Sequence, residues 1–121
     1  TGFGCVNCRK IEDNVWTDEQ VIERLKEYVI ISLYVDDRKA LPENEWFVST
    51  ATGKEREVKT VGQKWSAFQA EHFKTNSQPL YIIINTKEQL LNQPVAYDFS
   101  KDKGNYISFL ECGLKMNKQL K

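Results

Sequence analysis

The stretch Gly4-Cys5-Val6-Asn7-Cys8-Arg9-Lys10 places two cysteines three positions apart. The residues that follow can continue as a helix, which we expect to run from Cys5 to about Asn14. Cys5 would then lie at the helix N-terminus, where unpaired backbone N–H groups and the positive end of the helix dipole favour a thiolate. Cys8 would lie one turn later. Because thiolates attack disulfides, the spacing predicts a redox pair in which Cys5 attacks and Cys8 resolves the mixed disulfide.

The size and charge of the chain limit what it can be. Its 121 residues suit one domain, so we expect a single domain over residues 1–121. Lysine plus arginine equals aspartate plus glutamate at 17 each, and no basic excess indicates a nucleic-acid partner. No apolar run approaches the roughly 20 residues of a membrane span. Three cysteines are too few for a disulfide-stapled secreted scaffold.

The segment before Cys5 is unusually short for a helix that carries a redox pair, because such a helix normally follows a buried strand. The chain starts at Thr1 without a methionine or a signal peptide, so we expect an N-terminally truncated domain whose strand lies upstream in a longer parent protein. The absent strand would lie between residues 29–35 and 80–85. Without it we expect weak stability, or a gap filled by another chain.

Helical and strand-like segments alternate along the rest of the chain. Thr17-Asp18-Glu19-Gln20 fits a capping box with Thr17 as the N-cap, and an apolar stripe at helical spacing follows it. The β-branched runs at 29–35 and 80–85 predict strands that are covered on both faces. The pattern further predicts an insertion at about 37–61 with a hairpin pairing 46–48 with 57–59, helices at 62–74 and 104–118, and a short strand at 95–97 antiparallel to 80–85.

This order of elements resembles the thioredoxin fold. The segments Thr1-Gly2-Phe3-Gly4-Cys5-Val6-Asn7-Cys8-Arg9-Lys10-Ile11-Glu12 and Ser77-Gln78-Pro79-Leu80-Tyr81 look like the C-terminal thioredoxin-like domain of bacterial membrane thiol:disulfide interchange proteins, also called cytochrome c biogenesis proteins. The resemblance covers nearly the whole chain. It implies a thioredoxin-like three-layer α/β/α sandwich that lacks the strand before the CxxC helix.

The resemblance also implies a function. Such a domain is a protein-disulfide reductase in the periplasm, part of or associated with a membrane protein, that takes electrons from a membrane-embedded donor domain and passes them to oxidised client proteins; it uses no cofactor or metal. By position, the implied catalytic residues are Cys5, Cys8 and Glu12, and the implied client-binding residues are Phe3, Val6, Asn7, Gln78 and Pro79. Glu12 would accept a proton or tune a pKa, and Pro79 would be a cis-proline that shapes the client groove.

The chain departs from thioredoxins proper beside the cysteines. Gly4 replaces a tryptophan, and Val6-Asn7 replaces a Gly-Pro pair, which bears on the redox potential because the intervening residues tune the thiolate. Phe3 could equally anchor the turn, and Glu12 could equally be a solvated helix residue.

Two other functions remain open. One is zinc binding, in which Cys5 and Cys8 would supply two of the four ligands and Cys112 and His72 are the remaining candidates of soft type. We expect Cys112 to pack against a neighbouring helix and His72 to lie on a helix face. The other is a thioredoxin-like module that binds proteins without turnover.

Overall fold

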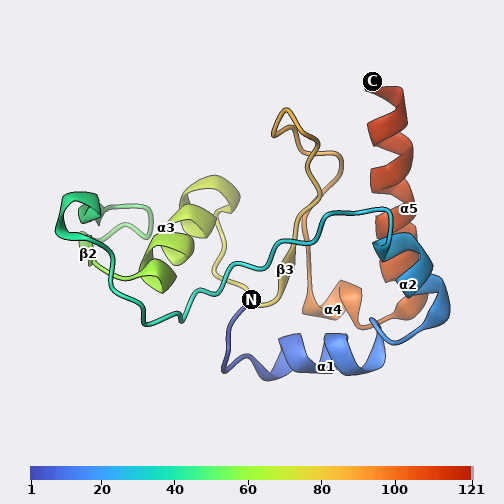
Figure 1. Cartoon of the computed structure of the whole chain (residues 1–121), viewed down its shortest axis with the longest axis horizontal. Helices are drawn as coiled ribbons and strands as arrows, with labels where there is room; N and C mark the ends of the chain where they lie inside the picture. Colours follow the sequence, from blue (N-terminus) through green and yellow to red (C-terminus); the bar gives the residue numbers. More distant parts are fainter. Residues whose placement is uncertain (121) are drawn as a thin grey trace. The chain divides into compact units, whose positions relative to one another are not determined.

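The computed structural model describes residues 1–120, and within them the chain forms a mixed α/β fold with five α-helices and two antiparallel two-stranded sheets (Figure 1). The chain divides into two compact units. The first unit comprises Thr1–Cys5 and Ser32–Ser77, and the second comprises Val6–Ile31 and Gln78–Lys121.

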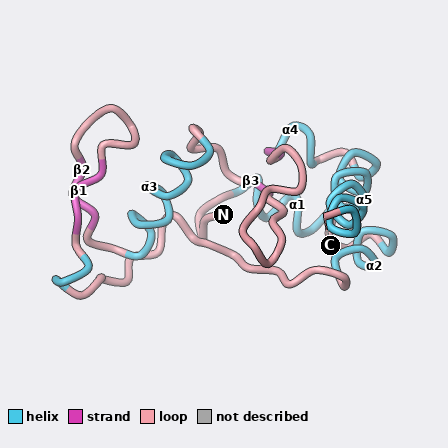
Figure 2. The backbone as a smooth tube through the Cα atoms, turned by 90° about the horizontal axis from the view of Figure 1, so that it is seen from above, coloured by secondary structure: helices cyan, strands magenta, loops and turns pink. Residues whose placement is uncertain are grey.

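The second unit contains most of the buried apolar side chains. Its elements are α1 (Val6–Asn14), α2 (Glu19–Leu25), β3 (Leu80–Tyr81), β4 (Val95–Ala96), α4 (Tyr97–Ser100) and α5 (Lys103–Gln119). Its core consists of Ile11, Val15, Val21, Ile83, Leu91, Tyr106, Phe109 and Leu110. Helices α2 and α5 pack side by side (Figures 1 and 2). This core explains why α1 and α2 are amphipathic, because each buries one stripe against α5 or its neighbours.

Helix α2 begins one residue later than the capping-box pattern predicts. Asp18, not Thr17, is the N-cap, and its carboxylate accepts hydrogen bonds from the backbone N–H groups of Gln20 and Val21. The Thr17 hydroxyl instead donates to the carbonyl of Asp13 in the preceding helix. The prediction of Thr17 as the cap was therefore wrong, because aspartate caps a helix as well as threonine and the backbone turn places Asp18 in the capping position.

The first unit contains the predicted hairpin. Its elements are the 3₁₀ turn η1 (Glu43–Glu45), β1 (Phe47–Ser49), β2 (Arg56–Val58) and α3 (Val61–Phe73). Strands β1 and β2 are antiparallel with Phe47 opposite Val58, which confirms the hairpin within the insertion. Thr60 and Gln63 form a capping box at the start of α3 that the sequence pattern did not single out. The cap fixes where the hairpin ends and the helix begins.

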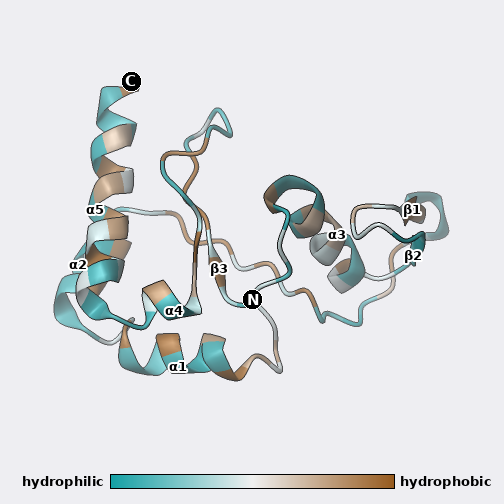
Figure 3. Cartoon of the chain, turned by 180° about the vertical axis from the view of Figure 1, so that it is seen from behind, coloured by the Kyte–Doolittle hydropathy of each residue, from teal (hydrophilic) through white to brown (hydrophobic). Residues whose placement is uncertain are grey.

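The strand predicted at residues 29–35 is not present. This segment is drawn as loop in Figure 2 and is hydrophobic over much of its length in Figure 3. Val29 is 90% exposed and Ile31 is 77% exposed. A strand needs a partner along its length. This segment instead bonds to the distant residue Thr1, whose N–H donates to the carbonyl of Leu33 and whose carbonyl accepts from the N–H of Val35.

The strand predicted at residues 80–85 is shorter than expected. Strand β3 covers Leu80–Tyr81 and pairs with β4 in the predicted antiparallel direction, with Leu80 opposite Ala96. Beyond it the chain forms a single antiparallel bridge between Ile84 and Leu90. The β-branched run therefore lacks a continuous partner after its second residue.

The observed elements confirm the α/β class, while the single domain, the three-layer sandwich and its thioredoxin-like character stay predictions. The helices predicted at 62–74 and 104–118 are α3 and α5, with ends shifted by one residue. Within residues 1–120, no helix combines the length and the apolar character needed to cross a membrane.

Replacing Gly113 with alanine is expected to destabilise the second unit. The added Cβ would lie 2.6 Å from the Tyr28 hydroxyl and 2.7 Å from Cδ1 of Ile83, so α5 would have to shift away from its neighbours. Overpacking of this kind costs about 1–3 kcal/mol of unfolding free energy, measured by urea denaturation. Ser108→Ala on the exposed side of α5 is the control and should change stability by no more than about 0.5 kcal/mol. Equal stability of the two variants would contradict the close approach.

Candidate redox site

The two cysteines of the CxxC motif are joined by a disulfide at the start of α1. Cys5 directly precedes Val6, the first residue of the helix, and is half-buried, whereas Cys8 is 1% exposed. The sulfur at the helix N-terminus is therefore the more accessible one. This is the arrangement expected of an attacking cysteine followed by a resolving cysteine.

Helix α1 buries one face and leaves the other to solvent. Cys8, Ile11 and Val15 follow one another at helical spacing and are all buried. Val6, between the cysteines, is 66% exposed, and Asn7 is partly exposed. The first turn of α1 carries no acidic side chain, so no carboxylate there opposes the attraction between the helix N-terminus and an anionic Cys5.

Glu12 lies four residues after Cys8 and pairs with Arg9, whose Nε is 3.1 Å from Glu12 Oε2. The environment of Tyr81 shows that Glu12 also faces β3. Burial raises the pKa of Tyr81 most, and the nearby Tyr106 and the Glu12 carboxylate raise it further, while Arg9 lowers it. Glu12 is thus one-third exposed at the edge of the core and not a fully solvated helix residue.

The peptide bond between Gln78 and Pro79 is cis, as the resemblance implies. Pro79 is fully buried and directly precedes β3. Successive side chains of an extended strand alternate, so Pro79 and Tyr81 project to the same side of β3. The Tyr81 ring lies 6.2 Å from the ring of Trp16, two residues beyond α1. Tyr81 therefore packs on the segment that follows α1.

In the first unit, the residues before Cys5 pack on residues 33–36. The Phe3 ring stacks on Tyr34 with centroids 4.0 Å apart, yet Phe3 remains 61% exposed. The Asp36 carboxylate accepts hydrogen bonds from the N–H groups of Phe3 and Gly4. Phe3 thus anchors the turn before the cysteine, and its exposed part is available to a partner.

The predicted site residues fall in both units. Phe3 and Cys5 belong to the first unit, and Val6, Asn7, Cys8, Glu12, Gln78 and Pro79 belong to the second. Sequence reasoning missed two residues that the structure adds. The first is Tyr81, which stands two residues after the noted Pro79, and the second is Asp36, which follows the segment predicted as a strand.

The remaining soft ligands do not join the cysteine pair. Cys112 is exposed on α5, so the expectation that it packs against a helix was wrong; its neighbour Gly113 occupies the inward position. His72 packs against Phe68 on α3, with ring centroids 4.6 Å apart. In the part of the chain that the structure describes, no three His, Cys, Asp or Glu side chains gather closely enough to hold a metal ion.

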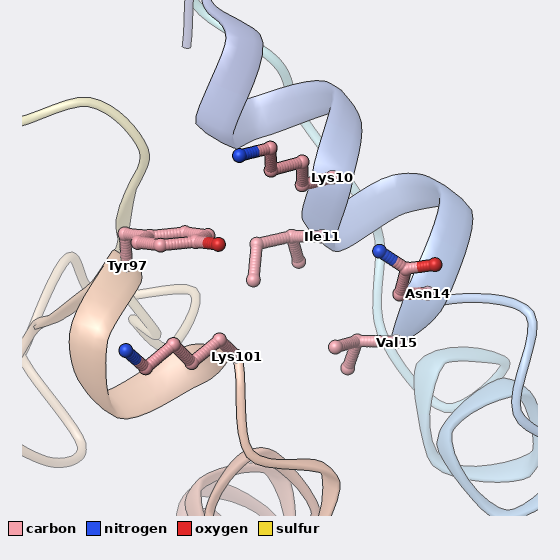
Figure 4. A pocket seen from close by; sticks show the side chains of 6 residues that line it. All are labelled: Lys10, Ile11, Asn14, Val15, Tyr97 and Lys101. Atoms are coloured by element: carbon pink, nitrogen blue, oxygen red, sulfur yellow. The ribbon is translucent and has the colours of Figure 1, made fainter.

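A small pocket lies between α1 and α4 (Figure 4). Its volume is about 40 Å³, far below the roughly 300–1,000 Å³ of pockets that hold small-molecule ligands. It is lined by Lys10, Ile11, Asn14, Val15, Tyr97 and Lys101. None of the predicted site residues lines this pocket, so it is separate from the cysteine pair.

No family model matches this chain, and no curated protein is similar enough to be matched to it.

Proposed function

We propose that this chain is a thiol-disulfide oxidoreductase that reduces disulfides of client proteins through Cys5 and Cys8. The observation that carries the proposal is the position of the pair. A half-buried cysteine stands directly before a helix and is disulfide-bonded to a buried cysteine one turn later. This geometry gives each sulfur a different role.

Cys5 is the nucleophile of the proposed reaction. The helix N-terminus stabilises its anionic form, since Cys5 directly precedes α1 and no acidic side chain stands in the first turn. Thiols in such positions have pKa values lowered to about 3.5–7.5, so a substantial fraction is thiolate at neutral pH. Cys8 is buried among apolar side chains, so its sulfur cannot attack a client disulfide directly.

The reaction exchanges disulfides in two steps. The Cys5 thiolate attacks one client sulfur, which forms a mixed disulfide and expels the other client sulfur as a thiolate that takes up a proton. Cys8 loses its proton and attacks the Cys5 sulfur, which forms the Cys5–Cys8 disulfide and releases the second client thiolate. The client gains two electrons and two protons. A donor dithiol must then reduce the Cys5–Cys8 disulfide before the next cycle.

Glu12 is the proposed acceptor of the Cys8 proton. It stands four residues after Cys8, hence on the same side of α1, and it is partly withdrawn from solvent beside Tyr81. Arg9 keeps the carboxylate paired and holds its position. A carboxylate at this place can take the proton when Cys8 becomes the nucleophile.

The client would bind beside the buried Pro79, with the backbone of Gln78 pairing to an extended client segment. The resemblance to membrane thiol:disulfide interchange proteins supports a thioredoxin-like fold, a periplasmic location and a membrane-embedded electron donor. The CxxC motif and the antiparallel β3–β4 pair agree with that resemblance.

Replacing Cys8 with serine should trap mixed disulfides. Cys5 can then attack an oxidised client, but no second sulfur is present to release it. We expect reduced Cys8→Ser protein, in a Cys112→Ser background that removes the exposed third thiol, to form covalent adducts with a disulfide-containing protein. The adducts are detected on non-reducing gels and located by mass spectrometry.

The matched control adds Cys5→Ser to the trapping variant and should capture nothing. Capture of the client by this control would contradict the roles of the two sulfurs. Failure of the trapping variant to capture the client would contradict them as well. A non-catalytic binding module gives a different result. It would bind partners equally well when both cysteines are alanine. It would also not transfer electrons from a donor dithiol to the disulfide of a client.

Glu12→Gln should slow the second step alone. Loss of a proton acceptor typically costs on the order of 10²-fold in rate, and the effect falls at high pH, where Cys8 ionises without help. Stopped-flow or quenched single-turnover measurements separate mixed-disulfide formation from client release. Asp13→Asn changes a neighbouring exposed acid of the same helix and should leave both steps unchanged. Equal effects of the two variants on client release would refute the role of Glu12.

A further inference from the structure

The Asp36 carboxylate binds the chain directly before Cys5. Its Oδ1 accepts the N–H of Phe3 at 2.8 Å, and its Oδ2 accepts the N–H of Gly4 at 2.9 Å. Both carboxylate oxygens are thus used on adjacent backbone donors. Asp36 is separated from Phe3 by 33 residues in the sequence, so this is a tertiary contact and not a local turn motif.

The two donors are the central residues of a turn that ends at Cys5. The N–H of Cys5 donates to the carbonyl of Gly2 at 3.3 Å, which closes the turn over Phe3 and Gly4. Two consecutive N–H groups that point to the same side form a concave site for an anion, and the Asp36 carboxylate occupies it. The position of the Cys5 backbone therefore depends on where this carboxylate holds the turn.

Two further contacts hold the same segment on residues 33–36. The ring of Phe3 stacks on Tyr34, and Thr1 pairs through its backbone with Leu33 and Val35. These contacts position the start of the segment. Asp36 is the residue whose side chain acts on the last two positions before Cys5.

Asp36 is held in its charged form. The hydrogen bonds from Gly4 and then Phe3 lower its pKa below the ordinary value. At neutral pH the turn is thus bound by a carboxylate and not by a carboxylic acid. An ionised acceptor makes shorter and stronger hydrogen bonds to backbone N–H groups than a neutral one.

We propose that Asp36 is a positioning residue for Cys5, whose ionised carboxylate fixes the turn so that the Cys5 sulfur stays at the N-terminus of α1. The consequence for catalysis rests on the proposed function, because a Cys5 that leaves the helix N-terminus loses the stabilisation of its thiolate. The proposal itself concerns the pKa of Cys5 and needs no client for its test.

Positioning and simple charge repulsion predict opposite changes in the pKa of Cys5. If Asp36 acted only as a nearby negative charge, its removal would favour the thiolate and lower the pKa of Cys5. If Asp36 holds Cys5 at the helix N-terminus, its removal weakens the interaction with the helix dipole and raises that pKa. Interactions with a helix terminus correspond to about 0.2–0.7 pKa unit.

The experiment measures the pH dependence of Cys5 alkylation by iodoacetamide in the reduced Cys112→Ser protein, with the modified peptide quantified by mass spectrometry. We expect Asp36→Ala to raise the pKa of Cys5 by about 0.2–0.7 unit and Asp36→Asn, which keeps one acceptor oxygen, to raise it less. Asp37→Asn is the matched control, because the Asp37 side chain accepts from Lys39 and not from the turn. A pKa of Cys5 that falls or stays constant in both Asp36 variants would overturn the proposal.

A second measurement uses the unchanged protein. In a pH titration followed by NMR, the amide protons of Phe3 and Gly4 should shift together, with a midpoint below the ordinary aspartate value of 3.8. The sign follows from the lowered pKa: the interaction is complete above the ordinary value and is lost as the pH falls through the lower, folded-state value. Amide protons of Phe3 and Gly4 that do not titrate would show that the carboxylate does not bind the turn.

The two proposals fail separately. A raised pKa of Cys5 in Asp36→Ala with no client capture by the Cys8→Ser variant would keep the positioning role and reject the reductase. Client capture by the Cys8→Ser variant with an unchanged pKa of Cys5 in Asp36→Ala would support the reductase and reject the positioning role.

Discussion

The burial of one face of α1 is the constraint on which the cysteine site depends. An isolated helix of nine residues is marginal in water, so α1 exists because Ile11 within it and Val15 directly after it are buried in the core of the second unit. Burial of two such side chains contributes roughly 3–6 kcal/mol. Cys8 is on the same face, so a rotation of the helix that exposed Cys8 would also expose both core residues. The packing of the core therefore determines that the Cys8 sulfur is the buried one.

Local patterns predicted most elements of the fold because their signals lie within a few residues. The apolar periodicity of α3 and α5, the β1–β2 hairpin and the antiparallel β3–β4 pair could all be inferred from the sequence. Residues 29–35 have an equally strong β-branched pattern but form no strand, because strand formation depends on a partner whose presence the pattern does not report. The cap of α2 was misplaced for a different reason, since Thr17 and Asp18 are both good capping residues and the preceding turn decides between them.

The candidate site was predictable to the same extent. The CxxC spacing predicted Cys5 and Cys8, and the resemblance to the thioredoxin family implied Gln78 and Pro79. Asp36 and Tyr81 were not predicted, because their roles come from contacts with residues distant in the sequence. An aspartate at the end of an apolar run looks like an ordinary strand terminator, and only the fold shows that its carboxylate binds the turn before Cys5.

The two sulfurs are supported by different parts of the chain. The turn that ends at Cys5 is held by residues 33–36 of the first unit, whereas Cys8 is held by the core of the second. In the proposed reaction, the first step depends on the ionisation of Cys5 and the second on the deprotonation of Cys8. Since Asp36 acts on the turn and Glu12 lies beside Cys8 on α1, a substitution at one support can change one step and leave the other intact. A buried pair held by one shared network would not permit this, because removing any member would disturb both sulfurs together.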